Sequence, residues 1–144
     1  IDISKLRENQ NIGVIHNISG TCSIDIDNRE DAITVFKFLG LDPVEMKNLY
    51  PCYRGKEEGI KFLFKMPDIA HIGIKKLAYK KGEEVITVFE LRGSTSGHGC
   101  QDLLPPSLHP SGVRYRWIKE PPSQFSDLPE LPIRLQELWK NFDV

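Results

Sequence analysis

Two aspartates separated by a single residue, Asp25 and Asp27, are the side chains in this sequence best placed to do chemistry. They close a run from Thr21 to Asp27 that reads as a β-strand, and side chains two positions apart on a strand point to the same face. Two carboxylates held together repel each other unless a cation lies between them. The pair is therefore a candidate cation site, and the alternative is an Asp-Asn turn with Asn28 that caps a following helix.

A basic stretch from Tyr53 to Phe64 offers a second kind of chemistry. It places Arg54, Lys56 and Lys61 around two glycines. Point charges together with free backbone N–H groups suit the oxygens of a phosphate. The same composition is also typical of a solvated, lysine-rich hairpin tip, so the stretch has both a functional and a structural interpretation.

An acidic residue lies near the end of a strongly apolar segment, Val85 to Gly93. Glu90 and Arg92 share one face of this segment by the two-residue alternation of a strand. Glu90 is therefore either a further cation ligand or one half of a structural ion pair.

A loop from Gln101 to Gly112 carries Ser107 and His109 after two consecutive prolines. Prolines stiffen the backbone, which suits a loop that grips a ligand, although Pro-Pro is also an ordinary end to a strand. Two other kinds of site find little support here. His98, Cys100 and His109 lack the spacing of a structural zinc site, and Ser107 lacks the G-x-S-x-G context of a serine hydrolase.

The chain has 144 residues, of which 40% are hydrophobic, and a formal net charge of −1. This size predicts one domain with a hydrophobic core, and the balanced charge means that any contact with nucleic acid must come from a local patch. Three widely spaced cysteines predict free thiols in a reducing compartment, and no apolar run approaches the roughly 18 residues of a membrane span. We therefore expect a soluble, cytoplasmic domain and, since the sequence begins at Ile1 rather than Met, a fragment of a longer protein.

Apolar periodicity and turn residues divide the chain into strands and helices. A helix is expected after Asn28, because Asn is a good N-cap, acidic residues follow in the first turn, and Gly40 would end it. Pro132 is predicted to open a C-terminal helix that runs to Phe142. We further expect a turn at 17–20, a short helix at 43–50, strands at 12–15, 21–26, 59–65, 72–79, 85–91, 103–104 and 113–118, and a proline-rich connection at 121–132.

Together, these motifs resemble those of a known family. The strings are Ser-Ile-Asp25-Ile-Asp27, Arg54-Gly-Lys with Gly59-Ile-Lys-Phe-Leu-Phe-Lys-Met-Pro67, Phe-Glu90-Leu-Arg-Gly93 and Leu-Pro-Pro-Ser107-Leu-His-Pro-Ser-Gly-x-x-Tyr-x-Trp117. They follow one another in the order found in bifunctional DNA primase/polymerase (prim-pol) domains of the archaeo-eukaryotic primase superfamily. The resemblance extends from about residue 11 to residue 117, and its last string is the most specific.

This resemblance implies an α+β fold, with a mainly antiparallel, RRM-like sheet and flanking helices, and a nucleotidyl-transfer activity. Asp25, Asp27 and Glu90 match the family's catalytic metal ligands, which would hold two Mg²⁺ or Mn²⁺ ions. Lys61 stands near the family's second motif, where a histidine normally contacts the phosphates of the incoming nucleotide. The residues implied to bind the nucleotide are Lys61, Arg54, Arg92, Ser107 and His109.

Two features depart from the family pattern. Lys61 replaces the usual histidine, and the segment that normally precedes the Asp-x-Asp strand is expected to be missing. The implied partners are a DNA template or primer, nucleoside triphosphates and a helicase domain on the full-length chain, in the replication of a plasmid, phage or mobile element. We expect a catalytic core over residues 1–120, and a proline-rich connection and C-terminal helix over 121–144 that pack on the same domain.

Two other functions also fit the residues. Asp68, followed by Glu90 and Arg92, loosely resembles the site of a metal-dependent nuclease, although Arg stands where Lys is usual and the Asp25–Asp27 pair would then have no role. A primase core that has lost its activity would instead be a nucleic-acid-binding module.

Overall fold

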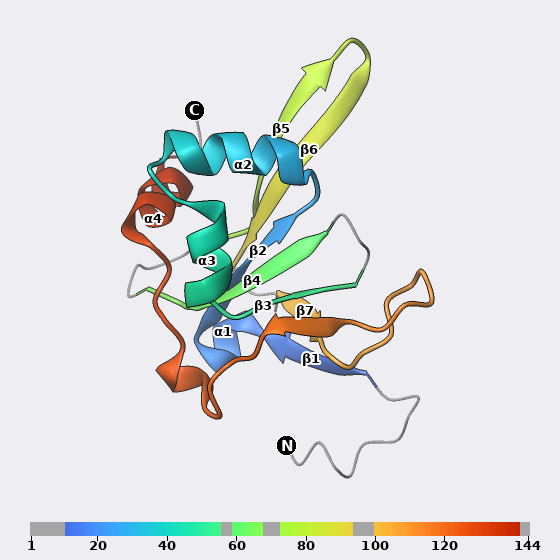
Figure 1. The fold of residues 1–144 in the computed structure, drawn as a ribbon, viewed down its shortest axis with the longest axis vertical. Coiled ribbons are helices and arrows are strands. Elements are labelled where there is room, and N and C mark those ends of the chain that lie inside the picture. The colour runs from blue at the N-terminus through green and yellow to red at the C-terminus, as the bar shows by residue number, and fades with distance from the viewer. Residues whose placement is uncertain (1–10, 56–58, 68–72, 94–99, 142–144) are drawn as a thin grey trace.

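A computed structural model describes residues 11–55, 59–67, 73–93 and 100–141. Within them, a six-stranded antiparallel sheet has the strand order β5-β6-β2-β4-β3-β8, and β1 pairs with β7 in a separate antiparallel ribbon (Figure 1). The predicted α+β fold class with antiparallel sheets is thereby confirmed. The elements are β1 (Ile12–Ile15), α1 (His16–Ser19), β2 (Thr21–Ile26), α2 (Arg29–Phe38), α3 (Pro43–Leu49), β3 (Cys52–Arg54), β4 (Ile60–Lys65), β5 (Lys75–Lys81), β6 (Glu84–Arg92), β7 (Gln101–Leu104), β8 (Arg116–Lys119), η2 (Phe125–Asp127) and α4 (Ile133–Lys140).

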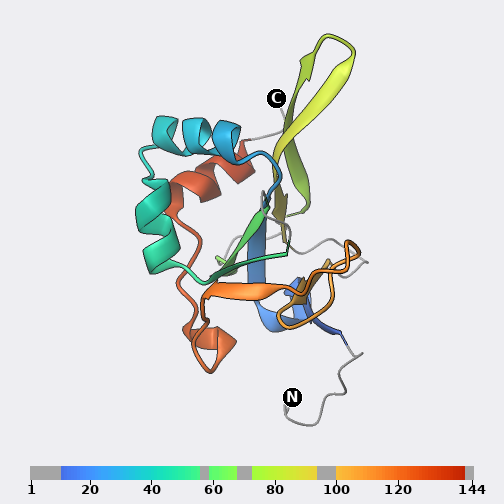
Figure 2. The ribbon, with the colours of Figure 1, turned by 45° about the vertical axis from the view of Figure 1, so that its right-hand side comes forward.

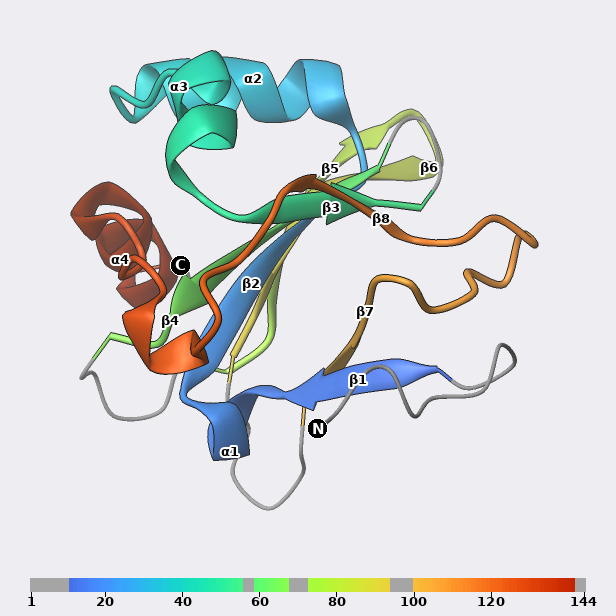
Figure 3. The same ribbon diagram turned by 60° about the horizontal axis from the view of Figure 1, so that its bottom comes forward.

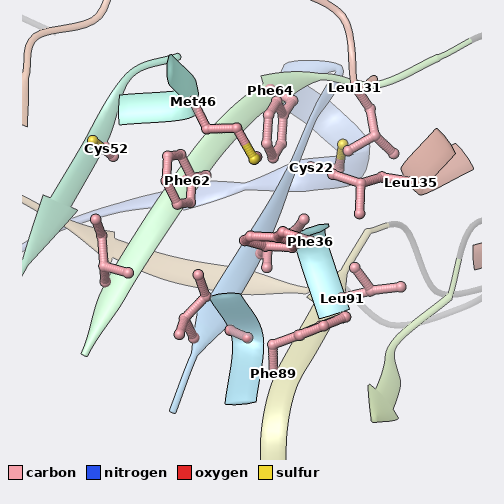
Figure 4. Close-up of a cluster of buried hydrophobic side chains, with 14 of the residues drawn as sticks. Cys22, Phe36, Met46, Cys52, Phe62, Phe64, Phe89, Leu91, Leu131 and Leu135 are labelled. Carbon is pink, nitrogen blue, oxygen red and sulfur yellow. The ribbon is translucent and has the colours of Figure 1, made fainter. Parts of the chain in front are cut away.

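The elements stack in layers. Helices α2 and α3 lie over one face of the six-stranded sheet, and the β1–β7 sheet lies on its other side (Figures 2 and 3). Alternate side chains of the central strands point toward the helices and form the main core (Figure 4). On strands β2, β4 and β6 these side chains are Cys22, Ile24, Ile26, Ile60, Phe62, Phe64, Phe89 and Leu91. Because the apolar alternate positions face the helices, the intervening positions of the same strands face the opposite side.

Helix α2 begins as the sequence predicts. The Asn28 side chain accepts a hydrogen bond from the backbone N–H of Asp31 at 3.1 Å. Gly40 follows the end of the helix with a φ of 76°, in the left-handed region that favours glycine. The helix buries Phe36, whose ring centre lies 5.8 Å from that of Phe89 on β6. The cap comes from Asn28 and not from Asp27, so helix capping does not account for the Asp27 carboxylate.

Some elements differ from the predicted ones. Residues His16–Ser19 form one helical turn, where only a turn at 17–20 is predicted, because Gly20 closes it at a φ of 68°. Strand β3 is not predicted from its sequence; it is short and forms because Cys52 and Tyr53 are buried between β4 and β8. The strands predicted at 72–79 and 113–118 begin later, at 75 and 116. Residue 72, where a strand is predicted to begin, and residue 142, where the last helix is predicted to end, both lie outside the described residues.

The C-terminal segment contributes to the main core. Leu131, Leu135 and Trp139 are buried in the same cluster as the central strands. The Trp139 indole N–H also donates to the backbone oxygen of Gly73 at 2.9 Å, which ties α4 to the start of the β5–β6 hairpin. Among the described residues, no helix is long and apolar enough to cross a membrane.

The three cysteines are free thiols, as predicted. Cys22 and Cys52 lie in the main core, and Cys100 precedes β7. All three side chains are buried, and burial raises the pKa of each thiol.

Candidate active site

A row of polar and charged side chains crosses the sheet face opposite the main core. Asp25 on β2 is paired directly with Lys61 on β4 and with Glu90 on β6. Lys76 on β5 lies opposite Glu90, and Tyr53 on β3 lies opposite Lys61. Directly paired residues of antiparallel strands point to the same face. Sheet pairing therefore brings together side chains that are up to 65 residues apart in the sequence (from 25 to 90).

A cleft opens at the end of this row that is formed by Asp25, Lys61 and Tyr53. It has a volume of about 320 Å³, and its walls come from β2, β4, the end of β3 and the loop before β8. The predicted site residues that line it are Asp25, Asp27, Arg54, Lys61 and His109. The structure thus brings five of the eight predicted residues into one cavity. Lys56, Asp68 and His98 lie outside the described residues.

Asp25 and Asp27 lie in an environment that disfavours their negative charge. The pKa of Asp25 is raised to about 6, chiefly by burial; the Lys61 ammonium opposes this rise, and the neighbouring carboxylates of Asp27 and Asp102 add to it. Burial and Glu90 likewise raise the pKa of Asp27. A divalent cation bound between these carboxylates would relieve this cost, because opposite charge favours the ionised form.

Glu90 faces the same side as Asp25 but is held by cations of the chain itself. Its carboxylate pairs closely with Arg92 and lies 3.6 Å from the Lys76 ammonium. Within the described part of the chain, no three His, Cys, Asp or Glu side chains stand together as a metal site. The predicted convergence of Asp25, Asp27 and Glu90 on one ion is therefore absent from this arrangement, because Arg92 and Lys76 engage Glu90.

Lys61 lies between two carboxylates. Its ammonium is 3.1 Å from Asp102 and 3.9 Å from Asp25, and it sits 5.7 Å above the centre of the Tyr115 ring. Burial alone would lower the pKa of Lys61, but Asp102 and Asp25 outweigh that effect and the pKa is raised. Lys61 is therefore a fixed positive charge on the wall of the cleft.

The loop residues Ser107 and His109 have separate positions. The His109 ring lines the cleft and packs edge-on against Tyr115, with ring centres 5.3 Å apart. Ser107 is fully buried, where its hydroxyl accepts from the backbone N–H of Ile12 at 2.7 Å and donates to the Ile12 oxygen at 3.0 Å. The expectation that Ser107 lines the pocket is corrected by this geometry, because its hydroxyl is used to attach β1.

Arg92 is also displaced from its predicted role. Its guanidinium lies between Glu90 and Asp102, at 2.9 Å from the latter, and donates to the Gln101 backbone oxygen at 3.1 Å. It does not line the cleft, so the structure gives it carboxylate partners rather than access to a phosphate.

Three functional candidates were missed by sequence reasoning: Asp102, His16 and Ser23. The buried Asp102 carboxylate binds the His16 imidazole at 2.7 Å and the Ser23 hydroxyl at 2.6 Å. His16 is completely buried and also contacts the Thr21 hydroxyl at 2.8 Å. The only signal in the sequence was a charged residue inside the short apolar strand before the two prolines.

The fold and site define an α+β domain with a cleft, lined by acidic and basic side chains, on the sheet face opposite helices α2 and α3. The family model for the N-terminal domain of bifunctional DNA primase/polymerase matches residues 2–133. The chain therefore belongs to the bifunctional DNA primase/polymerase family, and the resemblance inferred from the motifs is confirmed. No curated protein and no solved structure matches the chain.

Proposed function

We propose that this domain is a nucleotidyltransferase that adds nucleotides to a primer or initiating nucleotide on a DNA template, with two bound Mg²⁺ or Mn²⁺ ions. The observation that carries the proposal is the shared cleft: Asp25, Asp27 and Lys61 line it together. Glu90 lies directly across from Asp25 on the neighbouring strand. Acidic and basic groups side by side suit a triphosphate that arrives with its cations.

The donor set fits hard divalent cations. Asp25 and Asp27 offer carboxylate oxygens, the ligand type that Mg²⁺ and Mn²⁺ prefer. Glu90 can join them by exchanging its Arg92 and Lys76 partners for a cation. When bound, such ions supply charge neutralisation of the pyrophosphate leaving group and activation of the attacking 3′-hydroxyl.

The basic and aromatic side chains of the cleft fit the nucleotide. The Lys61 ammonium donates hydrogen bonds to phosphate oxygens, and Arg54 adds a second positive charge at the same cavity. His109 and Tyr115 present ring edges and faces for the sugar or base. This chain's own residues thereby orient the triphosphate toward the carboxylates of Asp25 and Asp27, which is the positioning that phosphoryl transfer requires.

Primer extension with labelled deoxynucleotides and ribonucleotides tests the proposal. A DNA template with an annealed primer is incubated with the protein and Mn²⁺ or Mg²⁺, and the labelled strand is sized. The proposed activity lengthens the strand. Shortening would indicate the nuclease alternative, and an unchanged strand that is nevertheless bound would indicate an inactive nucleic-acid-binding module. A helicase domain and a mobile-element context are further parts of the proposal, which sequencing of the full gene would test.

Cation binding is expected to depend on pH through Asp25. Because its pKa is about 6 in the metal-free protein, protons compete with the cation below that value. The apparent Mn²⁺ affinity should fall by about tenfold per pH unit below about pH 6 and level off above it. Electron paramagnetic resonance of free Mn²⁺ between pH 5 and 8 measures this. Asp31→Asn, which removes a surface carboxylate near Tyr79, is the control and should leave the profile unchanged. A flat wild-type profile would exclude Asp25 as a ligand.

Gly55→Ala is expected to weaken nucleotide binding by about tenfold through the cleft wall. A Cβ at this position would lie 3.0 Å from both His109 Cδ2 and Tyr115 Cε1, so both rings must shift. Isothermal titration with a non-hydrolysable nucleotide measures the effect. Gly73→Ala is the matched control, because nothing lies within 4 Å of the added carbon there. Equal affinities for Gly55→Ala and wild type would place the nucleotide away from these rings.

A further inference from the structure

A buried carboxylate lies behind the row of charged residues. Asp102 comes from β7 of the two-stranded β1–β7 sheet (the small sheet), and its side chain is only 2% exposed. Four groups of the large sheet and of α1 surround it: His16, Ser23, Lys61 and Arg92. Burial alone would raise the pKa of Asp102, but the His16 hydrogen bond and the Lys61 ammonium hold that pKa well below its usual range.

The two oxygens of Asp102 have different partners. Oδ2 is held by the His16 imidazole at 2.7 Å and by the Ser23 hydroxyl at 2.6 Å. Oδ1 faces the Lys61 ammonium at 3.1 Å and the Arg92 Nε at 2.9 Å. His16 and Ser23 thus fix the orientation of the carboxylate, and the other oxygen is presented to two cationic side chains.

Both cationic side chains have a second acidic partner in the candidate active site. Lys61 lies 3.9 Å from Asp25, and Arg92 pairs with Glu90. Each cation is therefore shared between Asp102 and a proposed metal ligand. If Asp102 lost its charge, the carboxylate partners left among the described residues would be Asp25 for Lys61 and Glu90 for Arg92.

We propose that Asp102 is a positioning residue that holds the Lys61 ammonium back from Asp25, so that this carboxylate can accept a divalent cation. The inference rests on the proposed function, because it takes Asp25 as a metal ligand. Buried ion pairs are often no more stabilising than apolar residues of similar volume, so the contact of Asp102 with a cation of the site favours a functional role.

A double-mutant cycle on metal binding tests the role of Asp102. Mn²⁺ binding is measured by electron paramagnetic resonance, without nucleotide, for wild type, Asp102→Asn, Lys61→Met and the double variant. Asp102→Asn should weaken Mn²⁺ binding about tenfold, and in the Lys61→Met background the same change should weaken it only about twofold. Loss of long-range negative charge alone would give the same fold-change in both backgrounds, and that result would overturn the proposal.

His16→Gln is the control, because it should lower the stability of the fold about as much as Asp102→Asn does. It removes one hydrogen bond to Asp102 and leaves the contacts of Asp102 with Lys61 and Arg92 in place, so the Mn²⁺ affinity should stay within about twofold of wild type. If His16→Gln and Asp102→Asn lowered the melting temperature and the Mn²⁺ affinity alike, Asp102 would be structural only, and the proposal would be wrong.

A measurement on the wild type covers the case in which Asp102→Asn does not fold. Nitrogen-15 NMR of the Lys61 ammonium should show a coupling across its hydrogen bond to the Asp102 carboxylate, and this coupling should persist at saturating Mg²⁺. A Lys61 hydrogen bond to Asp25 in place of Asp102 would contradict the proposal. Absence of any Mn²⁺ binding by wild type would overturn the proposed metal site together with this inference, whereas equal fold-changes in the cycle would overturn this inference alone.

Discussion

Asp25→Asn and Asp27→Asn are each expected to lower nucleotide incorporation by at least about a thousandfold, because each removes a proposed metal ligand whose transition-state stabilisation is several kcal/mol. The metal-free fold should survive the change. The folded pKa of Asp25, about 6, lies above its ordinary value. Ionisation of Asp25 therefore costs stability as the pH rises from about 4 to about 6, and the full cost remains above that window.

Thermal unfolding of the variants distinguishes the loss of a metal ligand from a loss of the folded structure. At pH 7 without metal, Asp25→Asn should unfold at an equal or higher temperature than wild type, with a gain of about 1 kcal/mol after allowance for partial exposure. Primer extension and thermal unfolding are run on the same preparations, with Asp31→Asn as the control. A clear loss of stability in both variants with Mn²⁺ binding retained would mean that the pair is a structural turn.

Lys61→Ala is expected to weaken nucleotide binding by about tenfold to a hundredfold, because a charge-assisted hydrogen bond to phosphate contributes about 1.5–3 kcal/mol. Mn²⁺ binding should not weaken, since the ammonium lies 3.9 Å from Asp25 and its removal favours a cation there. The effect should therefore appear as a raised KM for the nucleotide at saturating metal. Titration calorimetry with nucleotide and with Mn²⁺ measures the two affinities separately.

Two further variants make the result specific to Lys61. Lys61→His replaces it with the residue usual in the family and should restore part of the affinity. Lys80→Ala removes an exposed lysine from the β5–β6 hairpin and should leave nucleotide affinity within about twofold of wild type. Unchanged nucleotide affinity in Lys61→Ala would show that this position makes no phosphate contact, and would favour an inactive binding module.

The part of the site that could be predicted depends on local signals. Asn28, the acidic residues after it and Gly40 mark a helix by short-range chemistry, so the position of the two aspartates at the end of the preceding strand was predictable. Alternation in the segments that became β4 and β6 likewise indicated the faces on which Lys61 and Glu90 lie. The register of β2 with both strands then brought these residues opposite Asp25.

The part that could not be predicted depends on contacts between distant segments. His16 and Asp102 are 86 positions apart, and Ser107 and Ile12 are 95 apart. These contacts exist because β7 pairs with β1 rather than with a neighbour in sequence. No spacing within the chain reveals that pairing, so the sequence alone does not indicate the contacts of Asp102 and predicts Ser107 at the pocket instead of beside β1.

The distribution of the buried thiols gives each layer of the molecule its own chemical reporter. Cys22 and Cys52 lie in the main core, whereas Cys100 lies beside the small sheet that carries Asp102. A thiol of raised pKa, out of contact with solvent, reacts with an alkylating reagent only when its surroundings open. The rate at which Cys100 is labelled thus reports the opening of the small sheet, and the rates at Cys22 and Cys52 report unfolding of the main core, in a protein that needs no introduced label.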